Sequence, residues 1–403
     1  MEKQDKKLNV GLFIDTYYPM VDGVIQVVDS YARNLQKFCN VTVFAPIGRK
    51  DFDDSKLPYK IVRCKKKFPI FFLDYDLPTP AFDKNFQKQI EESNLDIVHI
   101  HSPFTIGKVG IKYAQKHNIP VVATIHSQFY KDFKNAVKLT GVAKLMMKIV
   151  IDTLNKCDVC WAVNDGIDKL FRDEFKLKAP TAMQYNATDL VPIDFSQKEF
   201  DEFDKKYGID KDEKVFCFVG RMTVLKNIPF LINALKVIKD HGIKFKMLMV
   251  GSGTDTKKFL KQAQKLGLEK EVLFVGRITD PRDKSLVFAR SDLFLFPSYY
   301  DTDGLVKYEA ACFGTPTASV KEFYAASNLS DGHNAYLSDN SYEHFAKRIV
   351  EAVSDPNYNE VRENCFKELY RTWQQSAEKV YGDYLKLIEE KKKEQPKDKN
   401  KKK

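Results

Sequence analysis

The sequence predicts an α/β protein built from two doubly wound domains. Short apolar runs of strand length alternate with helical segments along most of the chain, which is the order expected of parallel sheets covered by helices. The chain has 403 residues, of which 43% are hydrophobic. That length is too great for one core and suits two domains of ordinary size.

The first half contains apolar runs at residues 8–14, 41–45, 96–101, 121–126 and 157–164. The first run leads through a turn at Asp22-Gly23 into a segment with apolar residues at helical spacing. Such a turn lets the backbone approach a ligand, and a helix N-terminus favours anions. On spacing alone, a ligand loop containing Gly23 and an ordinary turn are equally supported.

Three histidines mark the ends of two of these strands. His126 ends the run 121–126, where it is well placed to donate a hydrogen bond to a bound substrate. His99 and His101 share one face of the preceding strand because side chains alternate along a strand. We expect His101 to lie near the ligand and His99 in the core. No third ligand has suitable spacing, so we predict no metal site.

The second half contains runs at residues 215–221, 246–250, 272–277 and 291–297. Glycines close three of them, at Gly220, Gly251 and Gly276, and Arg277 follows the last. This repetition predicts a nucleotide crevice. Neither the GxGxxG fingerprint of dinucleotide-binding domains nor a Walker loop is present.

Two cations flank the start of a helix directly after the first of these strands. Arg221 follows the strand, and Lys226 precedes Ile228-Pro229, where proline fits the first helical turn. Cations beside unpaired backbone N–H groups form a good diphosphate site. Farther along, Asp301 on a loop and Glu309 on a helix are expected to face one crevice at the carboxyl end of the sheet.

The charge distribution favours an anionic surface as a partner. The net charge is +10, and residues 108–156 hold nine Lys and two Asp. Residues 141–155 form an amphipathic helix flanked by Lys144 and Lys148, and residues 65–75 are basic and then aromatic. The candidate membrane residues there are Lys65, Lys66, Lys67, Phe71 and Phe72. The alternative is that both segments pack their apolar side chains inward.

Composition excludes other classes. No apolar run is long enough to span a bilayer, and seven scattered cysteines suit a reduced compartment. The lysines are not interleaved with an aromatic stacking platform, so nucleic-acid binding is unsupported. We expect an N-terminal domain at 1–190, a C-terminal domain at 191–365, a returning helix at 366–390 and a disordered basic tail at 391–403.

Gly220-Arg221-x4-Lys226-Asn227, followed by Asp301 and Glu309, resembles the retaining glycosyltransferases of family 4. The resemblance spans nearly the whole chain, and Asp22-Gly23-Val24 is similar to that family's glycine-rich donor loop. The segment Asp301-Thr-Asp-Gly-Leu-Val-Lys-Tyr-Glu309 is most similar to the bacterial branch that glucosylates diacylglycerol and its monoglucosyl product.

The resemblance implies two Rossmann-like domains facing a central cleft, the GT-B fold, and transfer of a hexose from a UDP-sugar without a metal or other cofactor. Arg221 and Lys226 would bind the diphosphate, and Glu309 would bind the ribose. Asp301 and the backbone near Asp303, Gly304 and Leu305 would orient the sugar, which His126 would also contact. The acceptor would be a lipid, with the protein peripheral to the cytoplasmic face of the membrane.

Two alternatives remain. The chain could glycosylate a cell-surface polysaccharide or an undecaprenyl-linked precursor. It could instead be a non-catalytic nucleotide-sugar-binding protein, because the family usually carries Glu where this chain has Asp301. One methylene less shortens the reach by about 1.5 Å.

Overall fold

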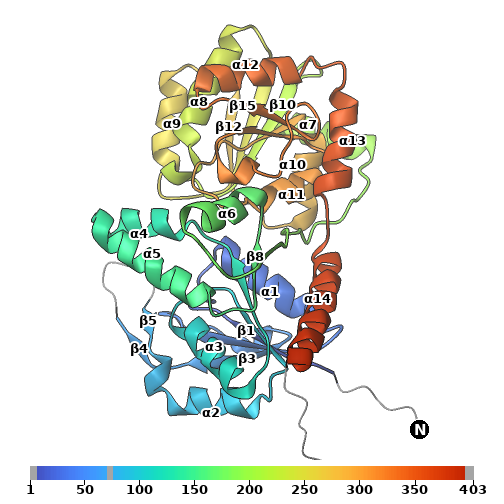
Figure 1. The fold of residues 1–403 in the computed structure, drawn as a ribbon. Helices are drawn as coiled ribbons and strands as arrows, with labels where there is room; N and C mark the ends of the chain where they lie inside the picture. The colour runs from blue at the N-terminus through green and yellow to red at the C-terminus, as the bar shows by residue number, and fades with distance from the viewer. Residues whose placement is uncertain (1–6, 70–75, 395–403) are drawn as a thin grey trace, which may run out of the picture. The chain divides into compact units, whose positions relative to one another are not determined.

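The computed structural model describes residues 7–69 and 76–394, and the chain divides into two compact units. Unit 1 comprises residues 1–185 and 373–403, and unit 2 comprises residues 186–372. Each unit contains one parallel sheet with helices packed against it (Figure 1). The predicted pair of doubly wound α/β domains is therefore confirmed.

The sheet of unit 1 has seven parallel strands in the order β3-β2-β1-β6-β7-β8-β9. The chain order reverses between β1 and β6, which lie side by side. The strands are β1 (Asn9–Phe13), β2 (Asn40–Pro46), β3 (Lys60–Cys64), β6 (Ile97–Ile100), β7 (Val121–Ile125), β8 (Val159–Ala162) and β9 (Thr181–Met183).

The helices of unit 1 include one from the far end of the chain, α14, which packs beside α1 (Figure 1). Strands β4 (Lys67–Phe68) and β5 (Leu77–Pro78) form a separate antiparallel pair. The helices are α1 (Gly23–Leu35), α2 (Lys84–Glu92), α3 (Thr105–His117), α4 (Phe129–Val137), α5 (Thr140–Leu154), α6 (Asp165–Lys169) and α14 (Trp373–Glu394).

The sheet of unit 2 has six parallel strands in the order β12-β11-β10-β13-β14-β15, and its chain order reverses between β10 and β13. The strands are β10 (Lys214–Val219), β11 (Phe245–Val250), β12 (Val272–Gly276), β13 (Leu293–Leu295), β14 (Thr317–Val320) and β15 (Ala335–Ser338). The helices are α7 (Gln197–Tyr207), α8 (Ile228–Asp240), α9 (Thr256–Lys265), α10 (Pro281–Arg290), α11 (Val306–Ala311), α12 (Tyr342–Ala352) and α13 (Tyr358–Leu369), with a 3-10 turn η4 (Val224–Lys226).

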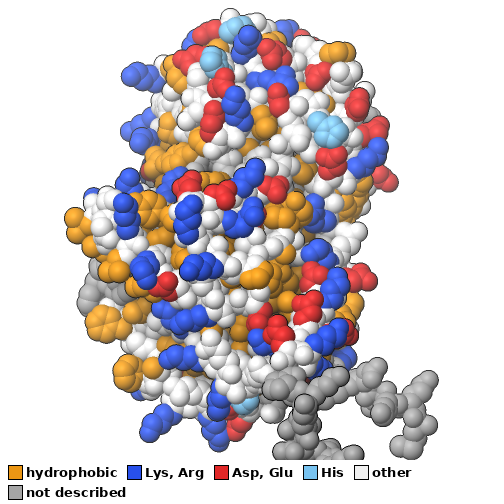
Figure 2. Space-filling model, in the orientation of Figure 1, with side chains coloured by type: hydrophobic (Ala, Val, Ile, Leu, Met, Phe, Trp, Pro, Cys, Tyr) orange, Lys and Arg blue, Asp and Glu red, His pale blue; other side chains and the backbone are white. Residues whose placement is uncertain are grey.

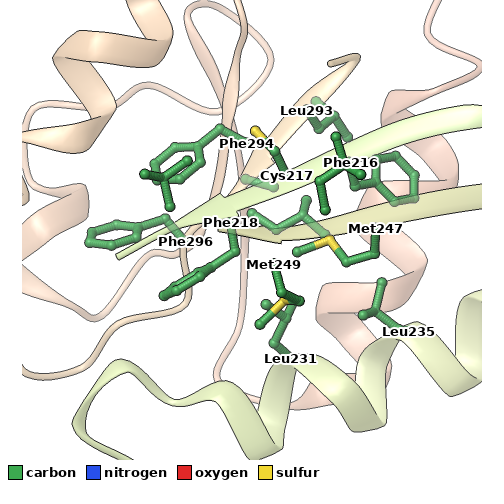
Figure 3. Packing of buried hydrophobic residues seen from close by; sticks show 14 of the residues in the cluster. Phe216, Cys217, Phe218, Leu231, Leu235, Met247, Met249, Leu293, Phe294 and Phe296 are labelled. Carbon is green, nitrogen blue, oxygen red and sulfur yellow. The ribbon is translucent and has the colours of Figure 1, made fainter. Parts of the chain in front are cut away.

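The core of unit 2 explains why the sequences of its strands are continuous apolar runs. Strands of a parallel sheet are covered on both faces, so nearly every position of the inner strands β10 and β11 is buried. Figure 3 shows Leu231 and Leu235, one turn apart on α8, pointing toward Met247 and Met249 of β11. All four side chains are inaccessible to solvent. This packing holds the start of α8 at the carboxyl edge of the sheet.

The boundary between the domains differs slightly from the sequence prediction. It lies at 185/186 rather than 190/191. The reason is that residues just before 191 bond within unit 2. Asn186 donates to the carboxylate of Asp303 at 2.6 Å, and the backbone N–H of Thr188 donates to the carbonyl of Arg371 at 3.0 Å.

The C-terminal prediction needs two corrections. Residues 366–369 end α13 in unit 2, and the helix that joins unit 1 begins at Trp373 rather than at 366. Residues 391–394 continue α14, although they were predicted to be disordered, because Lys391 pairs with Asp158 at 2.6 Å and Ile388 is buried one turn earlier. The rest of the predicted tail lies outside the described residues. No described helix is long and apolar enough to cross a membrane.

Candidate active site

The loops at the strand-order reversal of unit 2 bring two predicted residues together. Ligands of open α/β sheets bind at the carboxyl ends of strands where the order reverses. The loop after β10 carries Lys226, and the loop after β13 carries Asp301. Lys226 Nζ lies 2.5 Å from Asp301 Oδ1 and 2.6 Å from Oδ2, across 75 residues of sequence.

Buried neighbours hold this ion pair in place. The hydroxyl of Ser298, which is fully buried, donates to Asp301 Oδ2 at 2.5 Å. The Lys226 ammonium also lies 5.9 Å from the ring centroid of Phe296. Both side chains of the pair remain about one-fifth exposed, at 20% and 19%. Solvent, and therefore a polar ligand, can reach the pair.

Lys226 also lies at the start of a long helix, as predicted. It ends the short turn η4, and α8 begins two residues later with Pro229 in its first turn. The first N–H groups of a helix have no partner within the helix, and its dipole favours negative charge there. A cation beside such an N-terminus can hold a phosphate group. Arg221 lies on the same loop and is exposed.

Glu309 is held by a different cation. Lys284 of α10 donates to Glu309 Oε1 at 2.9 Å. Burial raises the pKa of Glu309 above its ordinary value; Lys284 opposes the shift, and the nearby carboxylate of Asp189 adds to it. The Glu309 side chain is 19% exposed, so a ligand can reach it, and a carboxylate fixed by one cation is a well-oriented hydrogen-bond acceptor. Lys284 was not predicted, because nothing local in sequence relates α10 to α11.

At two positions of the predicted site, backbone conformation and close neighbours permit only glycine. Gly251 has a φ of +132°, and a Cβ there would lie 1.9 Å from the carbonyl oxygen of Gly220. Gly304 has a φ of +77°, and a Cβ there would lie 2.5 Å from the ring of Phe296. Side chains are therefore excluded where these loops pass close to their neighbours. Gly276 also has a positive φ, and exposed Arg277 follows it.

The carboxylate of Asp303 does not face a ligand site. It is 4% exposed and accepts hydrogen bonds from Asn186, Lys307 and Tyr308. Its predicted contribution to donor binding is therefore confined to its backbone and that of Leu305. Lys307 was not predicted, although its spacing of four residues from Asp303 is typical of an ion pair at the start of a helix.

In unit 1, His126 follows β7 and is bonded to a second buried histidine. Its Nε2 lies 3.0 Å from Nδ1 of His101, while His99 contacts Tyr384 and Thr124 at 2.6 and 2.7 Å. Burial lowers the pKa of His99 and His101 well below the ordinary value, and the neighbouring imidazoles add to this effect. His99 lies in the core as predicted, whereas His101 is buried and supports His126.

The loops around β1 and β6 are fixed by Asp15, which was not predicted as a site residue. Its carboxylate accepts hydrogen bonds at 2.8 Å from the hydroxyls of Ser102 and Thr105 and from the N–H of Ile106. Asp22 caps α1, and a Cβ built on exposed Gly23 would meet nothing within 4 Å. The chain's own packing therefore does not require glycine at that position.

The predicted membrane surface comprises two segments, residues 141–155 and residues 65–75. Helix α5 buries only one side of its apolar stripe and leaves Val142, Leu145 and Ile149 exposed beside Lys144 and Lys148. The alternative, that this segment packs all of its apolar side chains inward, is wrong. Figure 2 shows hydrophobic and basic side chains side by side over α4 and α5.

Lys65 and Lys66 are exposed, whereas Lys67 pairs with Asp76 at 2.9 Å. Phe68, which follows them on β4, is 63% exposed and does not pack inward. Phe71 and Phe72 lie outside the described residues. This basic segment is therefore available to an anionic surface through two of its three lysines.

Comparison with known proteins adds the following. Residues 199–372 match the model of "Glycosyl transferases group 1", and residues 21–191 match that of "Glycosyltransferase Family 4". An alpha-monoglucosyldiacylglycerol synthase of Streptococcus pneumoniae is 27% identical over 88% of this chain and 80% of its own length. A protein of the same name from Acholeplasma laidlawii is 26% identical over 95% of this chain and 98% of its own length.

Solved structures support the fold. The crystal structure of HepE from Anabaena in complex with UDP superimposes with a TM-score of 0.73 at 15% identity, over 94% of this chain and 99% of HepE. The two family matches do not overlap and together cover most of the chain. The chain therefore belongs to the glycosyltransferases, with a family 4 domain followed by a group 1 domain in the GT-B fold.

Proposed function

We propose that this glycosyltransferase moves a hexose, with glucose as the first choice, from a UDP-sugar to a lipid acceptor such as diacylglycerol or monoglycosyl-diacylglycerol. The observation that carries the lipid acceptor is the exposed apolar face of α5, Val142, Leu145 and Ile149, flanked by lysines. Each lysine near an anionic bilayer contributes about 1 kcal/mol of attraction. Two relatives carry the name of a glycolipid synthase, which supports the same acceptor class.

The donor would occupy the crevice between the loops after β10 and β13. Arg221 and Lys226 would hold the diphosphate, with help from the N-terminus of α8. Glu309 would accept a hydrogen bond from a ribose hydroxyl. Asp301 and the backbone at Gly304 would orient the sugar. A diphosphate that binds Lys226 would take over part of its pairing with Asp301, so that the Asp301 carboxylate could also accept hydrogen bonds from sugar hydroxyls.

The reaction would retain configuration at the anomeric carbon. The bond from that carbon to the β-phosphate oxygen would break while the acceptor hydroxyl forms a bond on the same face, and its proton would pass to the departing phosphate oxygen. Arg221 and Lys226 would stabilise the charge that develops on the diphosphate. His126 would contact the sugar near its 6-hydroxyl. Arg221 and Lys226 would take the place of a metal ion at the diphosphate, so we propose that the activity is metal-independent. We also propose that the protein attaches peripherally to the cytoplasmic face of the membrane.

The test is incubation of the full chain with labelled UDP-glucose and vesicles of diacylglycerol in anionic phospholipid, with and without EDTA. The proposal expects labelled α-glucosyl lipid in both samples. Absence of labelled lipid with every sugar nucleotide tried would refute it. Label on an undecaprenyl-linked or polysaccharide acceptor instead would support the alternative transferase function. Lys226→Met should reduce turnover by orders of magnitude, because it removes a charge from the transition state.

The non-catalytic alternative is tested by Asp301→Glu. A large gain in turnover would indicate that the short side chain impairs the wild-type site. A loss would show that Asp is the adapted residue, since Asp301 already reaches both Lys226 and Ser298.

A further inference from the structure

A buried polar cluster in unit 2 connects the donor loop to the two points where the chain leaves this unit. The cluster consists of Asn186, Asp303, Lys307, Tyr308 and Asn328. None of the roles proposed for the donor site uses these side chains. These side chains connect segments that are distant in the sequence.

Lys307 is the centre of the cluster. It is fully buried, and its ammonium donates to Asp303 Oδ1 at 2.7 Å, to the carbonyl of Ala325 at 2.8 Å and to Asn328 Oδ1 at 2.5 Å. An ammonium group has three donors, and all three are used. Because the contacts come from the loop before α11 and from residues 325–328, Lys307 fixes these two segments relative to each other.

On one side, the cluster holds the donor loop. Asp303 lies two residues after Asp301, which pairs with Lys226, and precedes Gly304, which passes against Phe296. The hydroxyl of Tyr308 also donates to the Asp303 carboxylate at 3.0 Å. A displacement of Asp303 would therefore displace the backbone that carries Asp301.

On the other side, the cluster reaches both points where the chain passes between the units, at 185/186 and 372/373. Asn186, 4% exposed, donates to Asp303 Oδ2 at 2.6 Å. The N–H of Thr188 donates to the carbonyl of Arg371, and the Arg371 guanidinium lies 5.9 Å from the ring centroid of Tyr308. The two crossing segments are thus bonded to each other, the first is bonded to Asp303 through Asn186, and the second contacts Tyr308 through Arg371.

We infer that Asn186, Asp303 and Lys307 are positioning residues that couple occupation of the donor site to the two crossing segments. This inference rests on the proposed function, because it takes a nucleoside diphosphate as the ligand of the donor loop. A ligand that restrains Asp301 restrains Asp303, and through Asn186 and Arg371 it restrains residues 186–190 and 369–373. Coupling is reciprocal, so a change that loosens these segments also lowers the affinity of the donor loop for its ligand.

The test compares hydrogen–deuterium exchange of the full chain with and without saturating UDP. In the wild type, UDP slows exchange in residues 298–305 and also in 186–190 and 369–373. In Asn186→Ala, the slowing persists in 298–305 but is lost in 186–190 and reduced in 369–373, which keeps its contact with Tyr308 through Arg371, and the dissociation constant of UDP rises about fivefold or more. Asn334→Ala is the matched control, because Asn334 is equally buried but bonds to Ser330 and Glu368 instead.

The results separate the inference from the function. If UDP binds the wild type but exchange at the crossing segments is unchanged, or slows equally in Asn186→Ala, the coupling is refuted and the function stands. If neither UDP nor UDP-glucose binds the wild type, both are refuted. Should Asn186→Ala fail to fold, Asn186→Ser carries the same test with the same expected and opposing results.

Discussion

Replacement of Lys307 by methionine is the sharpest test of the energetics of unit 2. The substitution removes three hydrogen bonds and leaves the carboxylate of Asp303, 4% exposed, without its cation. Removing one partner of a buried ion pair lowers the free energy of unfolding by about 3–5 kcal/mol, because the remaining charge stays buried without compensation. For a domain of this size that cost corresponds to a fall in melting temperature of about 6–20 °C.

The double variant Asp303→Asn with Lys307→Met is expected to recover most of that loss. Removing both charges leaves no unpaired ion in the interior, and such exchanges are often near neutral. The asparagine can still bond to Asn186 and Tyr308. Unfolding is followed by differential scanning calorimetry of the full chain, where the transition of unit 2 is compared among variants.

Lys347→Met is the control, because Lys347 pairs with Glu351 on the surface of α12 and is 74% exposed. Such a pair contributes at most about 1 kcal/mol. A fall in melting temperature for Lys307→Met no larger than that for Lys347→Met would contradict the cost assigned to the unpaired Asp303 carboxylate. A double variant that melts as low as Lys307→Met alone would contradict it as well.

Three further predictions concern the glycines, the membrane surface and the buried histidines. Gly304→Ala should destabilise the chain more than Gly276→Ala, by about 1–3 kcal/mol in chemical denaturation, because both have positive φ but only Gly304 would also clash with a neighbouring ring; equal losses would contradict this. Leu145→Glu should reduce flotation with anionic vesicles, whereas Leu260→Glu, at an exposed position in unit 2, should not; equal effects would locate the membrane contact elsewhere. Burial lowers the pKa of His99, so the unfolded chain binds a proton below about pH 6.5 that the folded chain excludes, and stability falls with decreasing pH by up to about 1.4 kcal/mol per unit. His99→Gln should reduce the slope of melting temperature between pH 6.5 and 5, and an unchanged slope would contradict that assignment.

Local patterns in the sequence were sufficient for the elements that carry the candidate site. Long apolar runs at β10 and β11 and the glycines that close them indicate buried parallel strands, because full burial removes polar positions from a strand. Strands β3, β9, β14 and β15 were missed, because polar residues such as Arg63, Thr181 and Thr317 interrupt or flank their short apolar runs. Short runs of that kind resemble loops or parts of helices.

The contacts that make the site depend on the tertiary structure. Lys226 and Asp301 are separated by 75 residues, and only the strand order places their loops side by side. Lys284 is joined to Glu309 in the same way. Nothing local relates Asn186 to Asp303 either, so the domain boundary was placed a few residues too late.

The two-sheet α/β fold and the residue types of the candidate site follow from local patterns, because periodicity and helix signals are properties of neighbouring residues. Which of these side chains lie at an accessible edge and which are enclosed depends on the packing of distant segments. Asp301 and Asp303 differ by two positions in one loop, yet Asp301 is held at an accessible edge and Asp303 is enclosed with Lys307. Burial depends on what packs against a residue from distant segments, and that information is not local.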